Sequence, residues 1–201
     1  MTPPALQTPA PPRTAVEEAI VVAADALFTE NGFASVSMDR IAAAAAVPRG
    51  SVDAAFPSKQ QLVVASLRYR HQDWMNDLRA AEEPLADPRD KILAVFGLLE
   101  DCFTDHSYRG CAFVNGYGER GRLDPEIGEL ADEHLRQVEQ HVAVLCDRAA
   151  LPAHLAPALT LLIEGAQVKA SVHRDVRPAR TARTAAAMLM SMYDGASDDR
   201  F

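Results

Sequence analysis

The sequence predicts an all-α protein of about nine helices. Of its 201 residues 48% are hydrophobic, alanine is frequent, and runs of β-branched residues are scarce. These features favour helix over strand and allow a sizeable core. Apolar residues recur at three- and four-residue spacing, and capping residues, prolines and glycines bound the segments.

The net charge of −8 limits the possible partners. Binding of nucleic acid by the whole surface needs an excess of Lys and Arg, although a local basic face remains compatible with this charge. Three cysteines, Cys102, Cys111 and Cys146, show no metal-ligand spacing. No run approaches the ~18 apolar residues of a membrane span, and no signal-peptide layout is present. We therefore expect a cytoplasmic protein without a metal cofactor or membrane segment.

The first helix is predicted to begin at Thr14, in a capping box with Glu17, and to end at Asn31-Gly32. Its apolar face comprises Ile20, Ala23, Ala24, Leu27 and Phe28. The preceding residues 1–12 hold five prolines and are predicted to be a disordered arm, and residues 195–201 a frayed tail.

Residues 37–62 predict two short helices joined by a tight turn and followed by a third helix. Ser37 caps the first, Val47-Pro48-Arg49-Gly50 forms the turn, and Arg49–Ala55 is the candidate recognition helix. Ser58, in a second predicted capping box, begins a helix that continues to about Ala81.

Five more helices are predicted downstream, at 88–105, 111–119, 125–149, 156–173 and 178–193. Gly116 and Gly118 are expected to interrupt the helix at 111–119, and they indicate close packing or a bend there. Asp87-Pro88 and Asp124-Pro125 each place a cap before a proline. The helices at 156–173 and 178–193 are apolar on more than one face, so we expect them to form a homodimer interface.

The segment AIVVAADALFTENGFASVSMDRIAAAAAVPRGSVDAAFPSKQQLVVASL resembles the TetR family of transcriptional regulators. The shared features are ALFTENGF, VSMDRIA, VPRGS and FPSKQQL. Further on, GCAFVNGYGE resembles a Gly-Cys motif ending in Glu in one branch of the family's ligand domains. The resemblance implies a TetR-like fold, with a helix-turn-helix domain at 13–60 and a ligand-binding and dimerisation domain at 61–194.

The resemblance also implies a homodimeric repressor that leaves a palindromic operator when a small molecule fills its C-terminal pocket. Two departures from the family pattern alter that expectation. Asp53, Ala54 and Ala55 replace an aromatic-aromatic-His run, and Ala46 replaces a turn glycine. Between Thr14 and Gln60 three bases face six acids, a balance of −3. We therefore predict weak or unusually base-dependent DNA binding.

The residues predicted to contact DNA are Arg40, Arg49, Gly50, Ser51 and Lys59. The alternative interpretation is that these Arg and Lys side chains are exposed and contact only solvent. Asp53 could accept a hydrogen bond from cytosine, but a solvated carboxylate or a pair with a neighbouring Arg is the preferred interpretation.

A mixture of aromatic and polar residues forms the candidate ligand site, with core packing as the alternative for each aromatic. These residues are Trp74, Phe96, Phe103, Phe113, Asn115, Tyr117, Glu119, His134, Glu164 and Gln167.

The sequence leaves two alternative functions to consider beside a repressor. One is a TetR-fold module that binds a small molecule or protein and reads DNA weakly. The other is an enzyme using Cys111 with His106, for which no nucleophile signature exists, so we expect no enzymatic activity.

Overall fold

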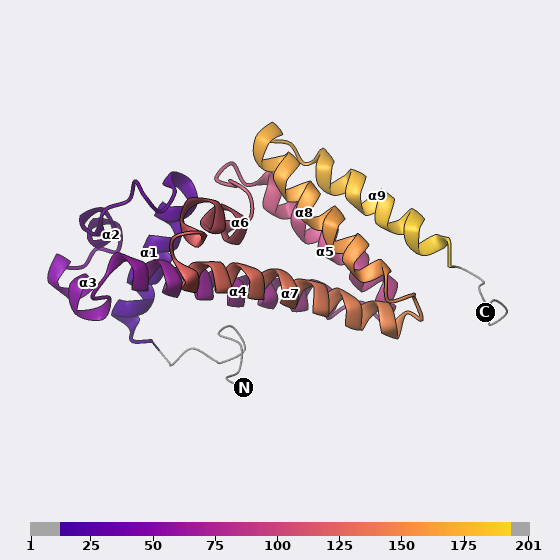
Figure 1. The fold of residues 1–201 in the computed structure, drawn as a ribbon, viewed down its shortest axis with the longest axis horizontal. Helices are drawn as coiled ribbons and strands as arrows, with labels where there is room; N and C mark the ends of the chain where they lie inside the picture. The colour runs from indigo at the N-terminus through magenta and orange to yellow at the C-terminus, as the bar shows by residue number, and fades with distance from the viewer. Residues whose placement is uncertain (1–12, 194–201) are drawn as a thin grey trace. The chain divides into compact units, whose positions relative to one another are not determined.

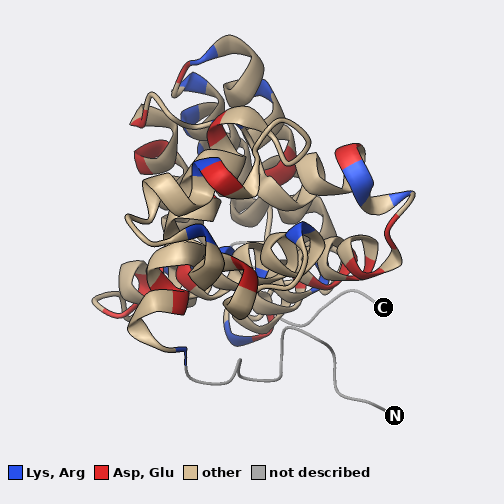
Figure 2. Cartoon of the chain, turned by 90° about the vertical axis from the view of Figure 1, so that its left-hand side faces the viewer, with Lys and Arg blue, Asp and Glu red and all other residues tan. Residues whose placement is uncertain are grey.

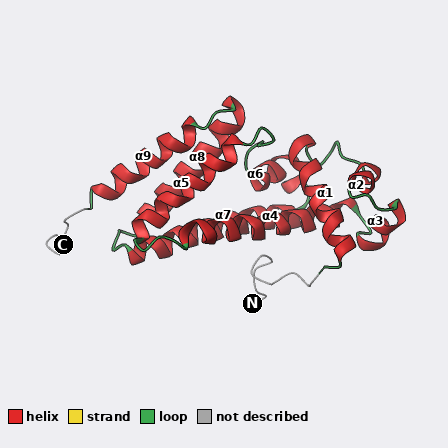
Figure 3. Ribbon diagram, turned by 180° about the vertical axis from the view of Figure 1, so that it is seen from behind, coloured by secondary structure: helices red, strands yellow, loops and turns green. Residues whose placement is uncertain are grey.

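The computed structural model describes residues 13–193, and all regular structure in that range is helical (Figures 1 and 3). Nine α-helices and one short π-helix follow one another there without a strand, which confirms the predicted all-α, TetR-like fold. None of these helices is long and apolar enough to cross a membrane. The predicted Pro-rich arm and frayed tail lie outside the described residues.

The chain divides into two compact units, each built from two separate stretches of sequence. The first unit joins Met1–Met75 with Cys111–Leu135, and the second joins Asn76–Gly110 with Arg136–Phe201. Two long helices, α4 (Lys59–Glu82) and α7 (Pro125–Arg148), contribute residues to both units.

In the first unit, α1 spans Ala15–Asn31 and begins with the predicted capping box. The Thr14 hydroxyl accepts a hydrogen bond from the Glu17 amide at 3.2 Å, and the Glu17 carboxylate accepts one from the Thr14 amide at 2.7 Å. Gly32 ends the helix at φ 76° and ψ 161°, a positive-φ conformation that glycine adopts without steric cost. Both predicted ends of the helix are therefore confirmed.

The two short helices that follow also match their predicted positions. Helix α2 spans Met38–Ala44, and the Ser37 hydroxyl accepts a hydrogen bond from the Arg40 amide at 3.2 Å. Helix α3 spans Arg49–Ala55, and Pro48 is its N-cap residue. Because the Val52 side chain is completely buried, one face of α3 is held against the core and the opposite face is exposed.

The connection between α2 and α3 passes through a left-handed residue, Ala46, at φ 54°. The Val47 amide donates to the Ala42 carbonyl at 3.1 Å, and the Ala46 amide donates to the Ala43 carbonyl at 3.2 Å. This pair of hydrogen bonds is a Schellman motif, which usually has glycine at the left-handed position. The departure noted in the sequence therefore places an alanine in a strained backbone conformation.

A single core joins α1–α3 and the start of α4 to the segment after residue 111. It includes Phe28 and Phe33, whose rings meet edge to face at 5.2 Å, together with Phe113 and Leu130. Phe33 and Val36, which follow α1 in the chain, are also buried in this core.

The short helix predicted over 111–119 is divided in the structure. Helix α6 spans Ala112–Gly116, and a π-helix, η1, spans Tyr117–Gly121. A Cβ on Gly116 would lie 2.9 Å from Cε2 of Phe33, so only glycine allows this close approach. Glycines favour helix weakly, which explains why the regular α-helical turn is not maintained past Gly116.

The second unit contains α5 (Pro88–Thr104), α8 (Leu155–His173) and α9 (Arg177–Ser191). The Asp87 carboxylate accepts a hydrogen bond from the Arg89 amide at 2.8 Å, which confirms the predicted cap. Helix α9 packs against both α5 and α8. Helix α5 contributes five buried side chains to this unit: Ile92, Val95, Phe96, Leu99 and Phe103.

Candidate functional site

The exposed face of α3 carries one cation, Arg49, and its guanidinium contacts two carboxylates. Nη1 lies 2.7 Å from Oδ1 of Asp39 on α2. Nη2 and Nε lie 2.9 Å and 3.1 Å from Oδ1 of Asp53, one helical turn further along α3. We call these three residues the Arg49 cluster. Of the two expectations for Asp53, a solvated carboxylate or a pair with a neighbouring Arg, the structure shows the pair.

The Arg49 cluster is open to solvent. The side chains of Arg49, Asp39 and Asp53 are 41%, 75% and 53% exposed. The hydrogen bond with Asp39, followed by that with Asp53, raises the pKa of Arg49 above its ordinary value. Since that value is already far above neutrality, the guanidinium is charged throughout the usual pH range. The cluster thus presents one positive and two negative charges.

The other two predicted DNA-contacting cations lie on α2 and at the start of α4. Arg40 is exposed, and its Nη2 lies 3.5 Å from Oδ1 of Asn31. Nζ of Lys59 donates to the Ala34 carbonyl at 3.1 Å. Burial, followed by the charge of Arg120, lowers the pKa of Lys59.

Gly50 and Ser51 belong to the first turn of α3. The structure thus brings Gly50 and Ser51 next to Arg49, and places Arg40 and Lys59 on the neighbouring helices. A Cβ added to Gly50 would meet nothing within 4 Å. Figure 2 shows acidic and basic residues interspersed along the helices.

The predicted ligand residues divide between the two units. Six belong to the first unit: Trp74, Phe113, Asn115, Tyr117, Glu119 and His134. Four belong to the second: Phe96, Phe103, Glu164 and Gln167.

Phe113 and His134 are both buried, and their rings stack at 3.8 Å with an interplanar angle of 4°. Nδ1 of His134 lies 3.0 Å from Nδ1 of His71, which is also buried. We call His71, Phe113 and His134 the ring cluster. Burial, followed by the neighbouring His71, lowers the pKa of His134 to about 3. His134 is therefore neutral near pH 7, and His71 was not among the predicted residues.

Glu119 connects the segment after α6 to the loop after α1. Its Oε2 accepts a hydrogen bond from the Phe33 amide at 2.9 Å. A Cβ on Gly32 would lie 2.9 Å from Oε1 of Glu119, so the carboxylate packs closely on the glycine. Trp74 is half-buried, and its Nε1 has no hydrogen-bond partner among the described residues. By contrast, Asn115 and Tyr117 are exposed.

In the second unit, Phe96 and Phe103 are core residues of α5, and Phe103 packs on Tyr108 at 4.8 Å. Glu164 and Gln167 lie half-buried on α8. Burial, followed by the charge of Glu139, raises the pKa of Glu164.

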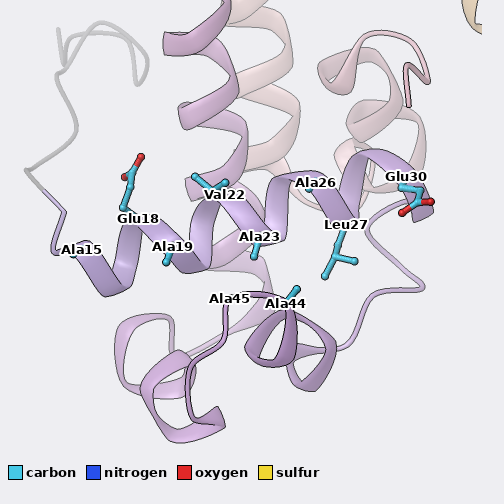
Figure 4. A pocket seen from close by; sticks show the side chains of 10 residues that line it. All are labelled: Ala15, Glu18, Ala19, Val22, Ala23, Ala26, Leu27, Glu30, Ala44 and Ala45. Atoms are coloured by element: carbon cyan, nitrogen blue, oxygen red, sulfur yellow. The ribbon is translucent and has the colours of Figure 1, made fainter. Parts of the chain in front are cut away.

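One apolar groove of about 670 Å³ lies on the first unit, along α1 and the end of α2 (Figure 4). None of the predicted ligand residues lines it. Its lining is mostly alanine, with an acid near each end: Ala15, Glu18, Ala19, Val22, Ala23, Ala26, Leu27, Glu30, Ala44 and Ala45. In the described part of the chain, no three potential metal-ligating side chains come together.

Fold and surface together define a class of protein: an all-helical protein with an N-terminal helix-turn-helix. Residues 20–65 match the family described as bacterial regulatory proteins, tetR family. The HTH-type transcriptional regulator YjdC of Escherichia coli (strain K12) is 25% identical to this chain over 164 residues. That alignment covers 78% of this chain and 83% of YjdC.

Solved structures agree with this fold. A TetR-family transcriptional regulator from Streptomyces coelicolor superposes with a TM-score of 0.78 at 22% identity, covering 88% of this chain and 95% of that one. The reduced form of NemR from E. coli superposes with a TM-score of 0.77 at 22% identity, covering 86% and 95%. The N-terminal part of the chain therefore matches the TetR family of bacterial regulatory proteins, and the described chain has a TetR-like fold.

Proposed function

We propose that the protein is a ligand-responsive repressor that binds a palindromic operator as a homodimer. The observation that carries this proposal is the exposed face of α3, where Arg49 stands beside Gly50 and Ser51. Burial of Val52 holds the opposite face of the helix, so these residues are oriented outwards. A recognition helix needs this arrangement to reach base edges in the major groove.

Contacts to phosphate come from the flanking helices. Arg40 on α2 and Lys59 at the start of α4 supply positive charge on either side of α3 in sequence. The small Gly50 lets the backbone approach DNA closely, and the Ser51 hydroxyl can donate or accept a hydrogen bond. With so few cations, the affinity depends less on salt than in a typical regulator.

Dimerisation through α8 and α9 is supported by exposed apolar side chains on both helices. These side chains are Leu161, Val168 and Val172 on α8 and Met188 on α9, followed by Met192 at the C-cap of α9. Apolar surface of this kind marks interaction sites on soluble proteins. Two recognition helices related by the dimer axis would then read half-sites ~34 Å apart.

A small molecule releases the protein from DNA by favouring a conformation in which the recognition helices lose this spacing. The candidate ligand residues include buried aromatic side chains and Glu164, a half-buried carboxyl group of raised pKa. Apolar walls with a few polar anchors are typical of small-molecule sites. The ligand-binding role is assigned to residues 61–194, and DNA reading to residues 13–60.

Selection of bound duplexes from a random DNA library tests this function. We expect enrichment of a palindrome with half-sites one helical turn apart, and a dimer in sedimentation experiments at micromolar concentration. The slope of log affinity against log salt should be shallower than about 8. A monomer, or an unstructured pool of selected sequences, would refute the repressor.

The alternative is a TetR-fold module that binds a small molecule or protein and has weak DNA reading. The observation favouring it is the engagement of Arg49 by Asp39 and Asp53, two acids within a region of net charge −3. Selection that enriches no sequence, combined with ligand-induced stabilisation of the protein, would support this module instead.

A further inference from the structure

The Arg49 cluster contains a donor arrangement that the sequence pattern does not reveal. A guanidinium has five N–H groups: one on Nε and two on each terminal nitrogen. Asp53 takes the Nε hydrogen and one from Nη2, and Asp39 takes one from Nη1. One N–H therefore remains on each terminal nitrogen. Because Asp53 occupies the edge formed by Nε and Nη2, a bidentate contact to O6 and N7 of guanine can use these two remaining donors.

The charges around Arg49 disfavour a contact between its guanidinium and a backbone phosphate. Phosphate clamps depend on net positive charge, and the Arg49 cluster carries two carboxylates for one guanidinium. A backbone phosphate at Arg49 would be repelled by Asp39 and Asp53, whereas a guanine edge is uncharged. The cluster thus favours base contact over backbone contact.

We infer that Arg49 reads a guanine in the operator, with Asp39 and Asp53 as positioning residues that orient its guanidinium and disfavour phosphate. This inference rests on the proposed function, because it names the base that the recognition helix selects. Asp39 lies on α2 and Asp53 on α3, so both helices of the helix-turn-helix hold the Arg49 guanidinium in place. Specificity is increased at the expense of non-specific affinity.

The test uses the full chain and the duplex enriched by selection. Binding is measured on that operator, on duplexes with each G·C pair of a half-site changed to A·T, and on random-sequence duplex, over a range of salt. The variants are Arg49→Ala, the double variant Asp39→Asn with Asp53→Asn, and the control Asp73→Asn. Asp73 is an exposed acid on α4, outside the Arg49 cluster, so its variant changes charge without changing the cluster.

Arg49→Ala should abolish discrimination at one G·C pair, a loss of about tenfold or more. Its salt slope should remain within about half a unit of wild type, because no phosphate contact is lost. The double variant should bind random-sequence duplex several-fold more tightly and discriminate less at the same G·C pair. Asp73→Asn should leave that discrimination unchanged. Because all the substituted side chains are exposed, each variant should retain its helical circular dichroism.

Two results would overturn the inference while leaving the repressor intact. In one, Arg49→Ala weakens all duplexes equally and reduces the salt slope by about one, as loss of a phosphate clamp does. In the other, the double variant discriminates as wild type does. Failure to enrich any sequence would refute the proposed function and the inference together.

Discussion

The first unit holds two clusters of titratable side chains that differ in burial. The ring cluster places His134 between a phenylalanine and a second histidine, out of contact with solvent. The Arg49 cluster places three charged groups at the surface. Burial suppresses ionisation of His134 and makes the packing of the ring cluster important to stability, whereas exposed pairs contribute little to folding. The Arg49 cluster is therefore free to serve recognition.

The largest expected effect tests the packing of the ring cluster. Phe113→Ala should reduce the free energy of unfolding by about 4 kcal/mol, because it leaves a cavity beside His134. Arg49→Ala should change it by less than about 0.5 kcal/mol. Urea unfolding of both variants measures the difference. If both variants lost the same free energy of unfolding, the ring cluster would be no more important to stability than the Arg49 cluster.

The second prediction concerns pH. The pKa of His134 is lowered to about 3 in the folded protein, below its unfolded value of about 6.5. The unfolded chain therefore takes up the proton first, so the stabilising contribution is complete above about pH 6.5 and is lost as the pH falls towards 3. From about pH 7 to about pH 5 this loss is about 2 kcal/mol.

Urea unfolding of His134→Gln at both pH values should show this loss reduced, while His106→Gln, an exposed control, should behave as wild type. An unchanged pH dependence in His134→Gln would show that this ring is not held neutral by the fold.

A third prediction addresses the contact between Gly32 and Glu119, which is intermediate in burial. Gly32→Ala should destabilise the protein by about 1 to 2 kcal/mol, because alanine is strained at φ 76° and its Cβ meets the carboxylate. In a Glu119→Ala background the same change should cost less, since only the backbone strain remains. The control Gly118→Ala has open space around its Cβ. Additive losses would show that the carboxylate does not restrict Gly32.

The smallest expected effect concerns Ala46, in the connection between α2 and α3. Ala46→Gly should stabilise the protein by about 0.5 to 1 kcal/mol by relieving the left-handed alanine. Ala150, at φ 52° after α7, gives a matched second site with the same expectation. Ala45→Gly, at φ −77°, should instead destabilise the protein. Thermal melts rank the three variants by stability. A loss of stability in Ala46→Gly would contradict the claim that the backbone of Ala46 is strained.

Local signals in the sequence predicted the helices well. The caps at Thr14, Ser37 and Asp87 act within four residues, so a short window contains the whole interaction. The interruption after Gly116 was expected from Gly116 and Gly118, but the partner in the close contact, the ring of Phe33, was not. The pairing of Arg49 with Asp53 follows from their i,i+4 spacing, but that with Asp39 does not.

By itself, the sequence determined the all-α class, the helix-turn-helix frame and the charges on α3. Periodicity and capping are properties of neighbouring residues, which explains this success. Only the tertiary structure decided that His71 meets His134, 63 residues away, and that Glu119 binds the Phe33 amide, 86 residues away. It likewise turned Asp39 towards Arg49. Such contacts depend on how helices pack, and packing brings together side chains that no local pattern connects.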